Sequence, residues 1–176
     1  MSQASFEGPS SVEPRVEDWV TAWRGPLVAL LRARGLDPGA ATELTQDVFA
    51  EAWLSRRRYR GSWDDERAVG RWLGGIARNL HRAALRRPRP APLATDPVDE
   101  RAGPHEAEAA RVRAAIDRLP RIEREIVRMF YLEETSTRRV AALLDLSERA
   151  VEGRLRRARE RLAEWLASHA DSVRSA

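Results

Sequence analysis

Neither cysteine nor lysine occurs among the 176 residues of the chain. Without cysteine the protein can form neither disulfides nor thiolate metal sites. All 31 basic residues are therefore arginines, which suit paired hydrogen bonds to phosphate or guanine better than lysine does. The three histidines, His81, His105 and His169, are scattered, and no pair has the spacing of metal ligands. We expect a protein with no metal and no cofactor.

Long apolar runs are also missing. No apolar stretch approaches the roughly 20 residues needed to cross a bilayer, and the first residues lack the apolar region of a signal peptide. We therefore predict a cytoplasmic protein with no membrane insertion. The sequence has no glycine-rich phosphate loop, no nucleophile motif and no supported pair of carboxylates, so we do not expect an enzyme.

Proline divides the chain. Five prolines lie in the segment 88–105, which has almost no apolar periodicity and is typical of an extended linker. The parts on either side are each too short for a large core, which favours an accessory protein. The sequence predicts an all-α protein of two small helical domains, at 15–87 and 106–168, with disordered ends at 1–14 and 169–176.

Three stretches of the first domain have helical apolar spacing, at about 16–34, 40–58 and 69–87. The first contains Gly25-Pro26, where a kink and a break are equally expected. The third has a stripe from Val69 to Ala84 for burial and arginines on the opposite face. Short connections between the three predict an antiparallel-type bundle.

Positive charge gathers around the third stretch. The segment from Leu54 to Thr95 holds eleven arginines and three acids, a net +8, while the whole chain carries only +4. The remainder therefore sums to −4, which favours a localised site for a polyanion over a generally basic surface. From charge alone, a solvated arginine face is equally possible.

The second domain contains a helix-turn-helix pattern. A short helix from Thr137 to Leu144 is followed by a turn at Asp145-Leu146 and a longer helix that Ser147 can cap. The apolar spacing is that of two helices packed against each other, and aspartate tolerates the positive φ often found in such a turn. A plain helical hairpin remains an alternative.

Several motifs follow one another in a single order: ATELTQDVFAEAW, RYRG, WLGGIARN, then the linker, AIDRLPRIEREIVRMFYLEE and SERAVEGRLRRARERL. Together they resemble the extracytoplasmic-function (ECF) sigma factors of bacterial RNA polymerase, over about residues 18–166. The resemblance implies a promoter-specificity subunit that performs no covalent chemistry. Its implied partners are core RNA polymerase, through the β′ clamp and the β flap, promoter DNA, and an anti-sigma factor that clamps the two domains together.

The resemblance also implies three sets of contact residues. The first, for core polymerase, lies on the polar side of the second helix, which charge alone would assign to solvent: Glu43, Leu44, Gln46, Asp47 and Glu51. The second is a loop for a flipped base of the −10 element and a helix for the opened strand: Ser62, Trp63, Arg67, Arg71, Arg78, Asn79, Arg82 and Arg86. The third would enter the major groove of the −35 element: Ser147, Arg149, Glu152, Gly153, Arg154, Arg156 and Arg157. For Trp63 a stacking role on DNA and a structural role are equally open.

Some residues depart from the family's pattern. Ala150, Glu152 and Gly153 replace a threonine, a basic residue and a serine, Arg139 replaces an acidic residue, and Ala83 replaces an aspartate. A glutamate in the groove repels phosphate but can accept from cytosine N4. Two alternatives follow, a sigma-like interaction protein without productive DNA binding and a stand-alone helix-turn-helix regulator. The arginine cluster argues against both, because a decoy needs no basic face.

Overall fold

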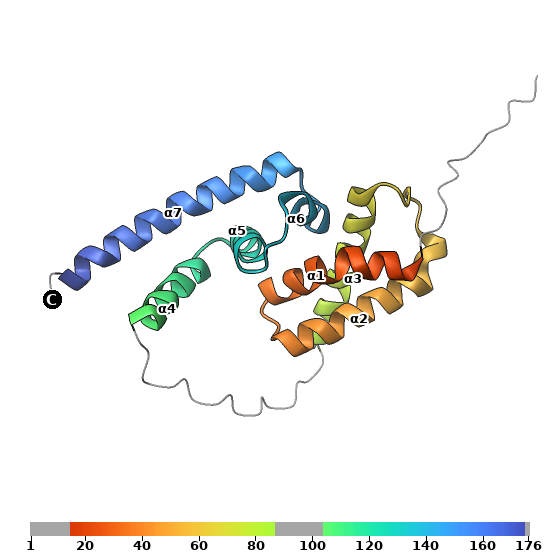
Figure 1. Cartoon of the computed structure of the whole chain (residues 1–176), viewed down its shortest axis with the longest axis horizontal. Helices are drawn as coiled ribbons and strands as arrows, with labels where there is room; N and C mark the ends of the chain where they lie inside the picture. Colours follow the sequence, from red (N-terminus) through yellow and green to blue (C-terminus); the bar gives the residue numbers. More distant parts are fainter. Residues whose placement is uncertain (1–14, 87–103, 175–176) are drawn as a thin grey trace, which may run out of the picture.

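The computed structural model describes residues 15–86 and 104–174, and every regular element within them is helical. The N-terminal unit contains α1 (Val16–Ala33), α2 (Pro38–Ser55), a 3-10 turn (Arg56–Arg58) and α3 (Glu66–Arg86). The C-terminal unit contains α4 (Pro104–Asp117), α5 (Arg121–Val127), a π-helical turn (Arg128–Leu132), α6 (Thr137–Leu144) and α7 (Glu148–Arg174) (Figure 1). The all-α prediction is confirmed. The predicted segment 1–14 and the predicted linker, up to residue 103, lie outside the described residues.

The N-terminal helices differ from their predicted bounds for local reasons. α1 runs unbroken through Pro26, because the face with Trp19, Trp23 and Leu27 is buried and its packing offsets the lost hydrogen bond. α3 begins at Glu66, earlier than predicted. The Asp65 carboxylate accepts from the backbone N–H groups of residues 67 and 68, at 2.9 and 3.1 Å, and so caps the helix start.

The helix-turn-helix region agrees closely with its prediction. α6 covers 137–144, and Asp145 ends it in the left-handed region with φ 57°. The Ser147 hydroxyl accepts from the backbone N–H of Ala150 at 3.1 Å, which caps α7. α7 then continues to Arg174, where a disordered tail was predicted from 169. No glycine or proline in that stretch ends the helix.

One expectation about the core is corrected. Ala84, the last residue of the stripe predicted for burial, is exposed. Its helical spacing continues the buried stripe, but the last turns of α3 extend past the body that would cover them. Spacing alone cannot show where the packing partner of a helix ends.

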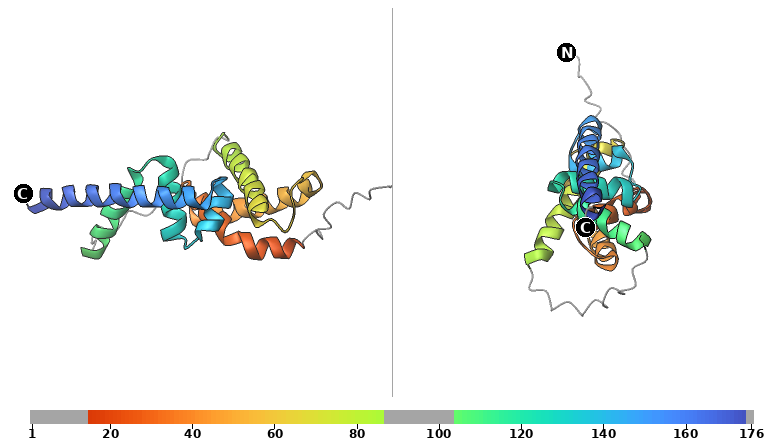
Figure 2. Two further views of the ribbon diagram at one scale, coloured as in Figure 1. Left: turned by 90° about the horizontal axis from the view of Figure 1, so that it is seen from above. Right: turned by 90° about the vertical axis from the view of Figure 1, so that its left-hand side faces the viewer.

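The two units pack against each other and share one hydrophobic core. The contact between α3 and α6 is the most extensive between any two elements described, and α1 contacts α5, α6 and the π-helical turn. Leu73 of α3 and Leu143 of α6 are both fully buried in the same cluster. α7 lies mostly outside this core and extends along the long axis of the molecule (Figure 2). None of the helices in the described ranges combines the length and apolar character that a bilayer-spanning segment needs.

Candidate nucleic-acid interface

An aromatic cluster holds the loop before α3. The Trp63 ring lies 4.3 Å from the Tyr59 ring, 5.1 Å from the Trp19 ring and 5.8 Å from the Trp72 ring, measured between centroids. The Tyr59 hydroxyl donates to the Ser62 carbonyl at 3.1 Å. Burial, and next the charge of Asp65, raise the pKa of Tyr59, so that this hydroxyl keeps its proton. The packing of Trp63 favours its structural role and leaves Ser62 at the rim of a fixed loop.

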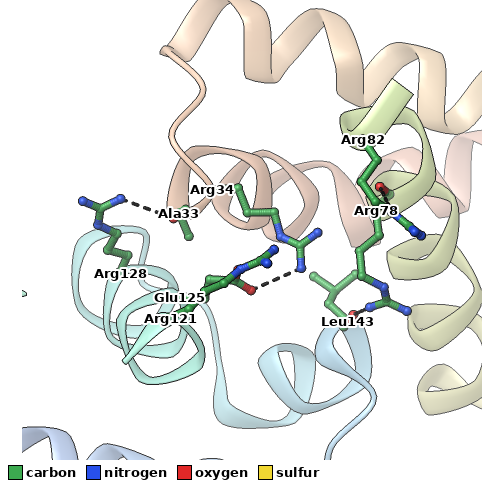
Figure 3. A network of polar contacts seen from close by, with 8 residues as sticks. All are labelled: Ala33, Arg34, Arg78, Arg82, Arg121, Glu125, Arg128 and Leu143. Atoms are coloured by element: carbon green, nitrogen blue, oxygen red, sulfur yellow. Dashed lines mark hydrogen bonds and ion pairs between the residues drawn. The ribbon is translucent and has the colours of Figure 1, made fainter. Parts of the chain in front are cut away.

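The arginine face of α3 is divided between solvent and the C-terminal unit. Most of its predicted members are exposed: Arg67, Arg71, Asn79, Arg82 and Arg86. The half-buried Arg78 guanidinium donates to the Leu143 carbonyl at the end of α6, at 2.8 Å (Figure 3). The exposed Arg71 makes a looser contact, 3.9 Å from the exposed Asp145 carboxylate. Burial, and next the charge of Arg34, lower the pKa of Arg78. α3 therefore carries six of the eight predicted residues, while Ser62 and Trp63 lie in the loop before it, and Arg78 is the member that the C-terminal unit partly buries.

The polar face of α2 is open to solvent. Of the five residues predicted there, Leu44 packs on the core. The other four are exposed: Glu43, Gln46, Asp47 and Glu51. Beside them at the end of α2 lie Trp53 and Leu54, which are 39% and 76% exposed. The predictions from the sequence did not include this apolar pair. Both lie off the buried stripe of α2, and a test for large apolar residues outside that stripe would have found them.

The start of α7 presents most of the predicted duplex set. The exposed members are Ser147, Arg149, Glu152, Arg156 and Arg157, and the half-buried members are Gly153 and Arg154. Arg157 also lies 3.7 Å from the buried carboxylate of Glu123 on α5, which Arg161 contacts at 2.9 Å. Arg157 therefore helps to hold α7 on α5, a role that its position in the sequence does not reveal.

A buried histidine lies where the two units meet. His81 is 7% exposed, and its Nε2 atom has no hydrogen-bond partner within the described residues. Nearby, Arg34, which directly follows α1, pairs with Glu125 of α5 at 3.2 Å (Figure 3). Burial first, and then the charges of Arg34 and Arg121, lower the pKa of His81, while Glu125 opposes them. The junction is therefore positively charged and stabilises neutral histidine.

This histidine predicts a loss of stability in mild acid. The unfolded chain takes up a proton near the ordinary histidine pKa of about 6.5, whereas folded His81 takes it up only at lower pH. Above about pH 6.5 both states are neutral, and as the pH falls from there towards the lower pKa of folded His81 the unfolded chain gains the proton first, so the free energy of unfolding decreases. Urea unfolding of the parent chain and of His81→Leu, at about pH 7.5 and about pH 5, should show a smaller loss in the variant. Parallel losses would contradict this role of His81.

Among the described residues no group of three or more histidine or acidic side chains could hold a metal ion. The fold and these surfaces define a two-unit helical protein whose C-terminal unit carries a helix-turn-helix. Residues 109–162 match the family model of sigma-70 region 4.

Comparison with known sequences and structures identifies the family more narrowly. It is 34% identical over 155 residues to the probable RNA polymerase sigma factor RfaY of Xanthomonas campestris pv. campestris, over 80% of this chain but only 37% of RfaY. It is 32% identical over 134 residues to the ECF RNA polymerase sigma factor RpoE of Cereibacter sphaeroides, over 72% of each chain. The structure of CnrH in complex with the cytosolic domain of CnrY is similar with a TM-score of 0.53 and 25% identity, over 87% of this chain and 88% of that chain. The chain belongs to the ECF RNA polymerase sigma factors.

Proposed function

We propose that this chain is a promoter-specificity subunit of RNA polymerase. It would bind core polymerase through the N-terminal unit, recognise the −35 duplex with the start of α7, and hold the opened −10 strand on α3. It would carry out no covalent chemistry and would act in the cytoplasm. The observation that carries this proposal is the arginine face of a rigid α3 in the same chain as a helix-turn-helix.

The −10 contact rests on charge and on a fixed loop. Arg67, Arg82 and Arg86 are exposed along α3 and can follow successive phosphates of a single strand. The loop at Ser62 is held by the aromatic cluster, so a base flipped out of the stack would meet a preformed edge. In this proposal Trp63 positions the loop and does not itself stack on DNA.

The −35 contact rests on the helix-turn-helix. Arg149, Arg154 and Arg156 lie on the first turns of α7, which enter the major groove in proteins of this type. Glu152 is exposed among them and would accept a hydrogen bond from cytosine N4. The promoter would therefore have a cytosine opposite this residue.

The polymerase contact rests on the exposed side of α2. Its acidic and amide groups offer polar contacts, and Trp53 with Leu54 adds an apolar anchor of the kind that dominates interface energetics. Family resemblance assigns this side to the β′ clamp and the C-terminal unit to the β flap. An anti-sigma factor is expected from the same resemblance.

The two alternatives lack a specific observation in their favour. A decoy or a stand-alone regulator would not need the exposed arginines at both ends of α3. Duplex binding without polymerase would favour the regulator.

Transcription in vitro tests the proposal. The purified chain is added to core RNA polymerase with a library of promoter fragments, and transcript starts are mapped beside a control sigma factor of known activity. We expect transcripts that depend on this chain and that share an upstream sequence. Silence of the whole library while the control sigma factor is active would refute the function. The DNA contacts should also weaken steeply with salt, because arginines release phosphate counterions.

A further inference from the structure

A cavity lined by arginines lies where the ends of α1 and α3 meet α5. Its volume is about 310 Å³, which is at the lower end of the range for ligand sites. His81 and the exposed Leu85 line it from α3. Its charged residues are four arginines and one glutamate, which give a net charge of +3: Arg34, Arg121, Arg124, Arg128 and Glu125. A concave surface of this charge concentrates anions.

The positive charge of the cavity is only partly neutralised by protein. Arg121, Arg124 and Arg128 follow one another at helical spacing, so they share one face of α5 and the turn after it. Arg121 donates to Glu125 at 3.1 Å, and Arg124 donates to the Asp117 carbonyl at 2.8 Å. Glu125 is the only acid of the lining, and its other oxygen already accepts from the arginine after α1 (Figure 3). Guanidinium groups have several donors, so this face keeps N–H groups for an anion.

Two buried nitrogen atoms of the lining have no hydrogen-bond partner within the described residues. They are Nε of Arg34 and Nε2 of His81, and each side chain is more than nine-tenths buried. Both residues line the same cavity. Buried polar atoms in folded proteins almost always have a partner, so two in one cavity point to a ligand that accepts from both.

We propose that this cavity binds a small anion with two linked phosphoryl groups, either free pyrophosphate or the diphosphate of a nucleotide. The anion accepts from Arg34 and His81 on one side and from the arginines of α5 on the other. A phosphate monoester carries about −1.5 to −2 near pH 7, and a second phosphoryl group brings the charge closer to that of the lining. A cavity between three helices suits a small anion better than a DNA strand, which follows an open groove. The site does not depend on the proposed function.

Calorimetric titration with pyrophosphate tests the site. The full chain is titrated without divalent cations at about 0.15 M salt, which screens distant charges. The side chain of Arg121 is 75% exposed, so Arg121→Gln should fold normally. The matched control is Arg111→Gln, which removes the same charge from an exposed position of α4 outside the cavity. We expect binding to weaken about ten-fold in Arg121→Gln and to keep the parent affinity in Arg111→Gln. No binding to the parent chain, or equal affinities in the two variants, would overturn the site.

A second titration tests the contact with His81. Sulfate is used because its charge does not change in mild acid. A bound anion offsets the charges of Arg34 and Arg121 and favours the protonated imidazole, so sulfate should bind more tightly as the pH falls from about 7.5 to about 5. This gain should shrink in His81→Leu, and equal gains in the two chains would overturn the contact. The other charged groups of the lining are the same in both chains: Arg124, Glu125 and Arg128.

Competition distinguishes the sources of the anion. ADP that binds more tightly than pyrophosphate would identify a nucleotide as the ligand, and ADP that binds no more tightly would identify free pyrophosphate. A short single DNA strand is the third competitor. If the strand displaces pyrophosphate and itself binds Arg121→Gln about ten-fold more weakly, the cavity is part of a DNA surface and the small-anion site is refuted. Transcription is measured separately, so a silent promoter library would refute the proposed function and leave this site standing.

Discussion

Alanine at both Arg78 and Arg82 is expected not to weaken binding to core polymerase and to lower open-complex formation about ten-fold or more. Each guanidinium is proposed to contact the opened strand, and the loss of two charged contacts, at about 1 kcal/mol or more each, has this size. Neither residue lies on the exposed face of α2 that is proposed to bind polymerase. Permanganate footprinting of the melted promoter and a polymerase-binding assay give the two readings.

The matched control removes the same charge elsewhere. Arg24 and Arg111 are exposed on α1 and α4, away from the arginine face of α3, and their double alanine variant should open promoters normally. Because Arg78 also donates to the Leu143 carbonyl, its loss should loosen the contact between the two units, an effect separate from strand binding. A template that is already unpaired at −10 removes the melting step, and the defect in strand binding should persist there. Normal open complexes in the Arg78 and Arg82 variant would contradict the assignment of this face.

Local patterns were sufficient to predict most of the fold. The bounds of α6 follow from its capping serine and its apolar spacing, and both depend only on neighbours in sequence. Bounds were missed where the cause lay in tertiary packing. α1 passes through Pro26 because of what it packs against, and Ala84 is exposed because nothing covers the end of α3.

The sequence could indicate which residues form a basic surface, but not which of them are already in contact with another part of the protein. Charge clustering located α3, and the helical repeat grouped its arginines on one side. Nothing in the repeat shows that Arg78 meets the Leu143 carbonyl, because that contact joins two segments on either side of the predicted linker. Gly70 and Gly74 were visible as small residues one turn apart, which is a usable signal for a close helix partner.

Glu125→Ala is expected to lower the free energy of unfolding by about 3–5 kcal/mol if the two units stay packed together. The carboxylate is 5% exposed, and its partner Arg34 is 7% exposed, so the variant buries an unpaired guanidinium. Arg121 and His81 lie at the same junction, and neither can supply the negative charge that Arg34 loses. Urea unfolding followed by circular dichroism measures the loss.

Removing both charges separates pairing from packing. Glu125→Leu with Arg34→Leu replaces the ion pair by apolar side chains, and this variant should unfold close to the parent value because neither charge is left buried alone. If the single variant instead opens the junction, Arg34 regains water and the loss shrinks to about 1 kcal/mol or less, while the radius of gyration from small-angle scattering rises. A small loss with the junction still closed would contradict the buried pair. The same two measurements therefore give the strength of the Arg34–Glu125 pair and the ease with which the two units separate.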